Sequence, residues 1–129
     1  MTEITPRYLR LADRAVSLAA DHSHETIHMH CALVVRKNRI VSIGYNSRRT
    51  SPQVKTRMRM WHAESAAMHR CSPKDLKGAD LVVVRYRRDG KTGLSRPCKV
   101  CLEGIKNLHV KRVFYTTGDP KLPVHIIYL

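Results

Sequence analysis

Hydrophobic positions along the chain recur with two different periods. In residues 6–21 apolar side chains return every three to four positions, and Pro6 stands in a first turn that tolerates proline, so a helix ending near Asp21 is predicted. Residues 31–46, CALVVRKNRIVSIGYN, are rich in Val, Ile and Leu on either side of Lys37–Asn38. This composition predicts two strands folded about that pair as a hairpin.

The second half alternates helices with strands. Residues 62–70 and 98–108 are predicted to be helices, and residues 79–87, 110–117 and 124–129 are predicted to be strands. A helix joins the strands 79–87 and 110–117, so these two are expected to be parallel. The connection to the last strand is too short for a parallel crossover, which predicts that this strand returns antiparallel or sits elsewhere.

This order of elements predicts an α/β fold in which helices flank a sheet. The 129 residues fit a single domain spanning residues 1–129. No segment has the pattern of a signal peptide and no apolar run is long enough for a bilayer. The chain is therefore expected to be soluble, cytoplasmic and without a membrane partner.

Basic residues outnumber acidic ones by 24 to 10, which gives a formal charge of +14. A charge of this size attracts phosphate-bearing ligands, and so favours a nucleotide or a nucleic acid. The polar segment 46–60 contains Pro52 and is predicted to be a long loop, a feature that usually binds a ligand in small domains. Its basic residues are Arg48, Arg49, Lys55, Arg57 and Arg59. For any single one of them, a solvated surface position is the simpler interpretation.

Candidate chemistry lies in two short stretches, MWHAESAAMHRC at 60–71 and RPCKVC at 96–101. His62, Cys98 and Cys101 supply one imidazole and two thiolates, a set that suits zinc and leaves one of four coordination positions open. All three are predicted near helix N-termini, where the helix dipole favours thiolate. Glu64, two residues after His62, is close enough to exchange a proton with a water molecule in the open position.

Each piece also has a simpler interpretation. CKVC alone occurs as often in structural zinc sites or redox pairs as in catalytic zinc sites. A structural site would need a fourth ligand, such as His69 or Cys71. Cys31 is interpreted as a small apolar strand residue and Cys71 as a buried helix end. A run of alternating histidines favours surface placement over a second metal site. Its members are His22, His24, His28 and His30.

The two stretches are more specific together than apart, because H-x-E followed by P-C-x-x-C is the signature of zinc deaminases of nucleobases. It stands here as His62-Ala63-Glu64 and Pro97-Cys98-Lys99-Val100-Cys101. With GYNS at 44–47, the chain resembles the cytidine and deoxycytidylate deaminase family, and it looks most like the small viral and phage members. It has TSP and SRPC where those have a THP-like turn and SKPC. The resemblance implies a three-layer fold with a five-stranded mixed sheet.

The resemblance also implies a reaction. Zinc held by His62, Cys98 and Cys101 would support hydrolytic deamination of a cytosine-containing nucleotide, dCMP or CMP, or of the nucleoside, to the uracil form with release of ammonia. Glu64 would carry the protons, and subunits would pair as a homo-oligomer. The implied substrate contacts come from Asn46, Trp61, Ala63 and Ser95. For Asn46 a purely structural role in a turn is the competing interpretation.

Three substrate classes and one noncatalytic role stay open. Arg48, Arg49 and Lys55 favour a phosphate, and so a monophosphate comes first. Cytosine or adenine within ssDNA or RNA is the alternative, although stacking of flanking bases has only Trp61 and Tyr45 to use. An antiparallel last strand would instead favour a free nucleoside. A basic nucleic-acid-binding or virion component that retains the fold is the noncatalytic hypothesis, against which Glu64 argues.

Overall fold

The computed structural model describes residues 4–21, 29–46, 63–87 and 89–129. The helices are α1 (Pro6–Asp21), α2 (Ala63–His69), α3 (Pro73–Leu76) and α4 (Lys99–Asn107). The strands are β1 (Met29–Arg36), β2 (Arg39–Tyr45), β3 (Asp80–Tyr86), β4 (Thr92–Gly93), β5 (Arg112–Thr116) and β6 (Val124–Tyr128). The predicted order of helices and strands is confirmed, and α3 and β4 are short additions that the sequence did not suggest. Within these ranges no helix is both long and apolar enough to cross a membrane.

The strands form one mixed sheet in the order β2-β1-β3-β5-β6, and β4 pairs with β3 beside this path. β3 and β5 are parallel, whereas β6 runs antiparallel to β5. Both predictions about strand direction are therefore confirmed. The hairpin between β1 and β2 turns at Lys37 and Asn38, which both have positive φ, 49° and 65°. Two positive φ values characterise the turn that matches the twist of paired strands.

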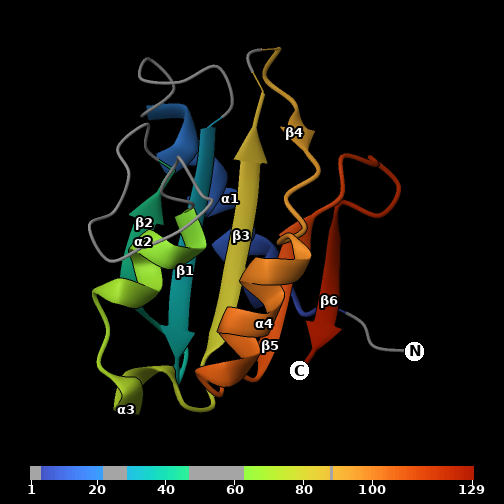
Figure 1. The fold of residues 1–129 in the computed structure, drawn as a ribbon. Coiled ribbons are helices and arrows are strands. Elements are labelled where there is room, and N and C mark those ends of the chain that lie inside the picture. Colours follow the sequence, from blue (N-terminus) through green and yellow to red (C-terminus); the bar gives the residue numbers. More distant parts are fainter. Residues whose placement is uncertain (1–3, 22–28, 47–62, 88) are drawn as a thin grey trace.

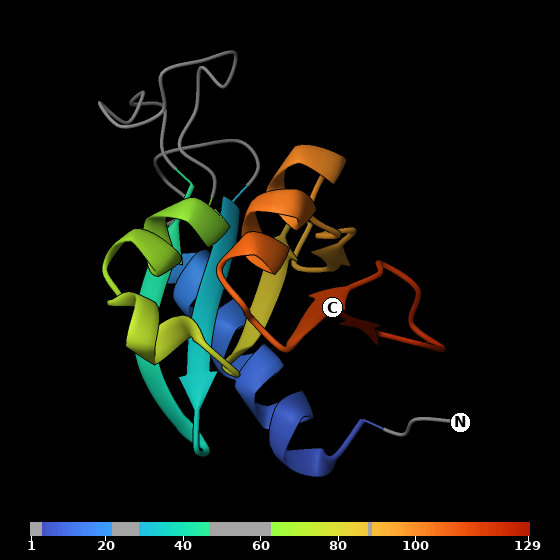
Figure 2. The same cartoon turned by 60° about the horizontal axis from the view of Figure 1, so that its bottom comes forward.

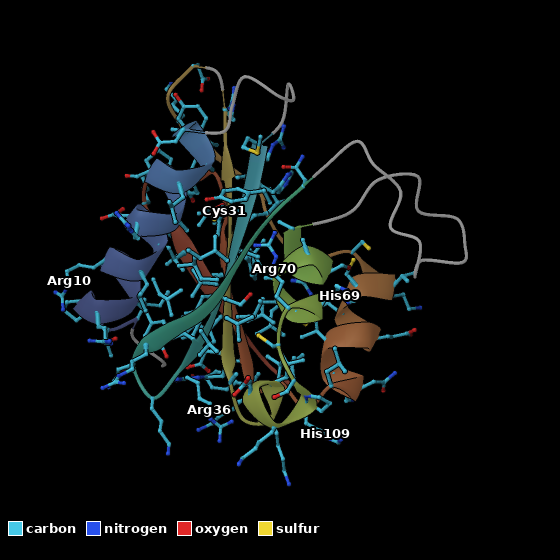
Figure 3. The ribbon with its side chains drawn as sticks, turned by 90° about the vertical axis from the view of Figure 1, so that its left-hand side faces the viewer. Arg10, Cys31, Arg36, His69, Arg70 and His109 are labelled. Carbon is cyan, nitrogen blue, oxygen red and sulfur yellow. The ribbon has the colours of Figure 1, made fainter. Side chains whose placement is uncertain are left out.

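Helices cover both faces of the sheet, as Figures 1 and 2 show: α1 lies behind it, and α2 and α4 lie side by side in front. Figure 3 views the three layers from the side. On the α1 face, Ala15 and Ala19 pack in one cluster with Phe114. On the other face, Ala67 and Ile105 pack in a second cluster that includes strand valines. Alanines at these helix positions let the helices approach the sheet closely.

A polar network links α1 to the start of the parallel strand pair. Arg112 donates from Nε and Nη2 to the two carboxylate oxygens of Asp80, over 2.8 and 2.7 Å. The hydroxyl of Tyr8 donates to the same carboxylate, and its ring stacks on Phe114 with centroids 4.1 Å apart. Burial, followed by the hydrogen bond to Asp80, raises the pKa of Tyr8 to about 12. The network fixes α1 on the sheet at the level where β3 begins.

Candidate active site

Glu64 lies in the first turn of α2 and is only 5% exposed. A carboxyl group that is buried costs free energy unless other groups interact with it. Glu64 lies beside α4, because after burial its charge and a side-chain hydrogen bond both raise the pKa of the Cys101 thiol. The two helices therefore bring together residues that the sequence predicted to share one site.

The position of α2 is set by β2. A Cβ atom on Gly44 would lie 2.3 Å from the backbone nitrogen of Ala67 and 2.5 Å from the carbonyl oxygen of Ala63. Only a residue without a side chain allows this contact between strand and helix. Ser42 adds a hydrogen bond of 2.7 Å from its Oγ to the carbonyl of Ala67. The depth at which Glu64 sits is thus decided by the packing of β2 against α2.

Cys98 and Cys101 mark the start of α4. Cys98 is the N-cap, and its Sγ accepts a hydrogen bond from the backbone nitrogen of Cys101 at 3.4 Å. Cys98 is exposed and Cys101 is buried. Burial raises the pKa of the Cys101 thiol, and the neighbouring charge of Glu64 and contact with Cys98 raise it further. The first turn of α4 contains no acidic residue.

This donor set fits a dication. Burial, the charge of Glu64 and contact with Cys98 all oppose ionisation of the Cys101 thiol, and a bound zinc ion would remove that opposition by stabilising the thiolate. His62, the third predicted ligand, lies outside the described residues. In the part of the chain that the structure describes, no three His, Cys, Asp or Glu side chains are grouped so as to hold an ion. The complete ligand set therefore stays a prediction.

The segment that leads to Cys98 is held by Ser95 and Thr116. The Ser95 hydroxyl donates to the Val83 carbonyl at 2.7 Å and accepts from the Thr116 backbone nitrogen at 2.8 Å. Thr116 Oγ1 lies 2.8 Å from Ser95 Oγ and donates to the carbonyl of Gly93 at 2.6 Å. Ser95 is 4% and Thr116 2% exposed. The side chain of Ser95 thus has a structural function. The contact of its backbone with a base stays a prediction.

Thr116 was not singled out from the sequence. The signal that could have found it is a hydroxyl residue at the end of the apolar run VFYT, which forms β5, the next strand after Ser95 along the chain. Ala63, the other predicted frame residue, is 1% exposed at the start of α2. Its contact with a base stays a prediction.

Asn46 follows β2 and is 7% exposed. Its Oδ1 accepts a hydrogen bond from the backbone nitrogen of His30 at 2.8 Å, which ties the end of β2 to the start of β1. The structural interpretation of this residue accordingly has an observed contact, while the substrate contact stays a prediction.

Several other predicted residues lie outside the described residues. They are Arg48, Arg49, Lys55, Trp61, and His22, His24 and His28 of the histidine run. His30 belongs to β1.

The remaining cysteines and His69 lie apart from the site. Cys31 is fully buried in β1, as predicted, and burial raises its pKa to about 12. Cys71 follows α2 and is half-buried, not fully buried as predicted, because its thiol lies at the helix end and donates to the carbonyl of Ala67 at 3.7 Å. His69 is exposed at the same end of α2 (Figure 3). Both are separated from Glu64 by most of a helix that rises about 10 Å, which disfavours either as a fourth ligand.

Comparison with known proteins agrees with this arrangement. A sequence model described as "Cytidine and deoxycytidylate deaminase zinc-binding region" matches residues 5–117. No curated protein sequence matches the chain.

The solved structures of similar fold include deaminases that are named for different substrates. The dCMP deaminase of cyanophage S-TIM5, solved with dCMP and dUMP, superposes with a TM-score of 0.62 at 21% identity over 89% of this chain and 85% of its own. Cytidine deaminase from Burkholderia pseudomallei gives 0.55 at 15% identity, over 90% and 91%. A Thermotoga maritima diaminohydroxyphosphoribosylaminopyrimidine deaminase/reductase gives 0.54 at 24% identity, over 88% of this chain and 30% of its own. At these identities the likeness establishes the fold alone.

Proposed function

Because the chain belongs to the cytidine and deoxycytidylate deaminase family, we propose that it is a hydrolytic deaminase that converts a cytosine-containing nucleotide, dCMP before CMP or the nucleoside, to its uracil form and releases ammonia. The observation that carries this proposal is the placement of a buried Glu64 on α2 beside the Cys101 thiol in the first turn of α4, which Cys98 contacts in turn. A structural zinc site has no use for a buried carboxyl group that is not a ligand.

His62, Cys98 and Cys101 would hold zinc, which when bound supplies a Lewis acid that makes water a nucleophile near neutral pH. The protein's contribution is to fix the donors. Cys98 is held by its N-cap geometry and Cys101 by burial in the first turn of α4. The Ser95–Thr116 hydrogen bonds hold the segment that precedes them.

Glu64 is the proposed proton carrier. Hydrolytic deamination forms a C4–O bond and breaks the C4–N bond, so the attacking water must lose protons and the departing amine must gain one. A single carboxyl group can accept a proton from water, deliver it to ring N3 and then supply one to the amine. Burial of Glu64 beside Cys101 keeps bulk water from competing for these protons.

We further propose that the substrate carries a phosphate group. The net charge of +14 favours an anionic substrate over an uncharged nucleoside. The likeness in fold to a phage dCMP deaminase points the same way. The antiparallel β6 was expected to favour a free nucleoside, so the charge and the strand direction give opposite indications. Assembly as a homo-oligomer stays a prediction.

Ammonia release tests the reaction and its substrate together. Zinc-loaded protein is incubated with cytidine, CMP, dCMP and a cytosine-containing single strand, with Glu64→Ala as the matched blank. We expect turnover of dCMP above the others and none in the variant. Absence of turnover with all four, in protein that binds one zinc, would contradict the proposal.

The second candidate function, a basic protein that binds nucleic acid, has an observation in its favour. Exposed Arg10 and Arg14 lie on α1, on the opposite face of the sheet from α2 and α4, where Figure 3 shows Arg10 pointing outward. Positive charge so far from Glu64 is not needed to bind one nucleotide. Binding of a random oligonucleotide would distinguish the roles, because many phosphate contacts give a steep dependence on salt and one nucleotide gives a shallow one.

A further inference from the structure

Arg96 lies in the segment between the buried Ser95 and the N-cap Cys98, and its guanidinium rests on an aromatic residue of the sheet. Its Cζ is 5.8 Å from the ring centroid of Tyr115, and Nη1 donates to the Tyr115 hydroxyl at 3.4 Å. The same hydroxyl lies 3.2 Å from Nδ1 of His125, whose ring meets Tyr115 edge-on. Three side chains from three segments thus form one row.

Tyr115, the middle residue of this row, is held in place by its surroundings. Tyr115 is 5% exposed on β5 and precedes Thr116, which holds Ser95. Pro97 follows Arg96 and is itself buried. Because Arg96 is fixed on both sides along the chain while its side chain is exposed, the guanidinium has a defined place at the surface.

The charge of Arg96 is not neutralised by a neighbour in the described ranges. Ion pairs in these ranges join Arg87 to Asp89 and Arg112 to Asp80, and neither of these involves Arg96. A guanidinium held by an aromatic ring keeps most of its N–H donors available for a second partner. α4 starts three residues later, at Lys99, and its first turn has no acidic side chain, so the helix dipole adds to the positive potential.

We propose that Arg96, held in place by Tyr115 with His125 beside it, binds the phosphate group of the nucleotide substrate. This inference rests on the proposed function, which places the base at Glu64. Arg96 is two residues from Cys98, and so its Cα lies within about 8 Å of that of Cys98. A phosphate on a nucleotide whose base reaches Glu64 is therefore within range of an arginine side chain. Bidentate N–H donors match phosphate oxygens in geometry and charge.

The test compares two ligands that differ only in the phosphate and do not react, dUMP and deoxyuridine. Their dissociation constants are measured by calorimetry for zinc-loaded wild type, Arg96→Gln and the control Lys106→Gln, which removes one charge at the other end of α4. The ratio of the deoxyuridine constant to the dUMP constant is expected to fall by about 10- to 100-fold in Arg96→Gln. It should be unchanged in the control.

Tyr115→Phe separates placement from charge. It removes the hydroxyl shared by Arg96 and His125 and keeps the ring under the guanidinium. We expect the same ratio to fall by a smaller factor while deoxyuridine binding stays at its wild-type value. If Tyr115 had only a structural role, the substitution would weaken the binding of both ligands by the same factor.

The outcomes separate this inference from the proposed function. A ratio that is unchanged in Arg96→Gln overturns the phosphate site, even if the wild type deaminates dCMP. A fallen ratio in a protein without turnover supports the site and overturns the deaminase. If Arg96→Gln weakens a random single strand and leaves the ratio unchanged, the residue serves polynucleotide phosphates and the proposal fails.

Discussion

Gly44→Ala is the substitution that links the fold to the chemistry most directly. The added methyl group would stand 2.3 Å from the nitrogen and 2.8 Å from the Cα of Ala67, and 2.5 Å from the oxygen of Ala63. All three atoms belong to the backbone of α2, so no side chain can rotate away. Gly44 has no positive φ, and the cost of alanine is therefore steric alone.

The size of the effect follows from these distances. Ordinary contact begins at 3.4 Å, so relief of the 2.3 Å contact requires α2 to move by about 1.1 Å (3.4 − 2.3). Overpacking of this kind typically costs about 1–3 kcal/mol of the free energy of unfolding. Glu64 moves with α2, and a displacement near 1 Å of a catalytic group can lower the rate by about 100-fold. The loss of activity is thus expected to exceed the loss explained by unfolded protein.

Urea unfolding and kcat/KM for dCMP measure the two effects on the same sample. Gly104→Ala is the matched control, because Gly104 lies within α4 and a Cβ there meets nothing within 4 Å. Removing a helical glycine should stabilise the protein by up to about 1 kcal/mol and leave activity unchanged. Wild-type activity and stability in Gly44→Ala would refute the argument that β2 sets the position of Glu64.

Three further results are expected from the buried groups. Asp80→Ala leaves Arg112 without its carboxylate and should lower the free energy of unfolding by about 3–5 kcal/mol in urea titrations; a change below about 1 kcal/mol would contradict the network's importance. Between about pH 10, the usual pKa of tyrosine, and about pH 12, Tyr8 keeps its proton in the folded state and loses it in the unfolded state. The free energy of unfolding should therefore fall as pH rises through that window. Tyr8→Phe should remove up to about 1.4 kcal/mol per pH unit of this slope, and an unchanged slope would refute the assignment. Cys31, with a pKa of about 12 and no exposure, should react with maleimide only as fast as the protein unfolds, and rapid labelling of the native protein at this position would contradict its burial.

The sequence predicted much of the fold because its signals are local. Apolar periodicity placed the helices and strands, and the length of each connection set the directions of β5 and β6. The pair Lys37–Asn38 marked the hairpin through turn chemistry alone. These features depend on residues that are close in the chain.

Long-range contacts could not be predicted in the same way. Tyr8 and Asp80 meet only because α1 crosses the sheet where β3 begins, and neither side chain signals the other in the sequence. The contact of Gly44 with α2 depends on the distance between two layers, which periodicity does not specify. Glu64 and Cys101 could be paired beforehand only through a motif whose spacing reflects a known reaction.

The central claim is that Glu64 moves protons and does not hold the metal. Zinc content by metal analysis and conversion of dCMP to dUMP are measured on wild type and Glu64→Gln, purified in parallel. We predict equal zinc in both proteins and a rate lower by at least about 100-fold in Glu64→Gln, in keeping with loss of a general acid and base. Zinc lost together with activity, or turnover within a few-fold of wild type, would contradict the claim.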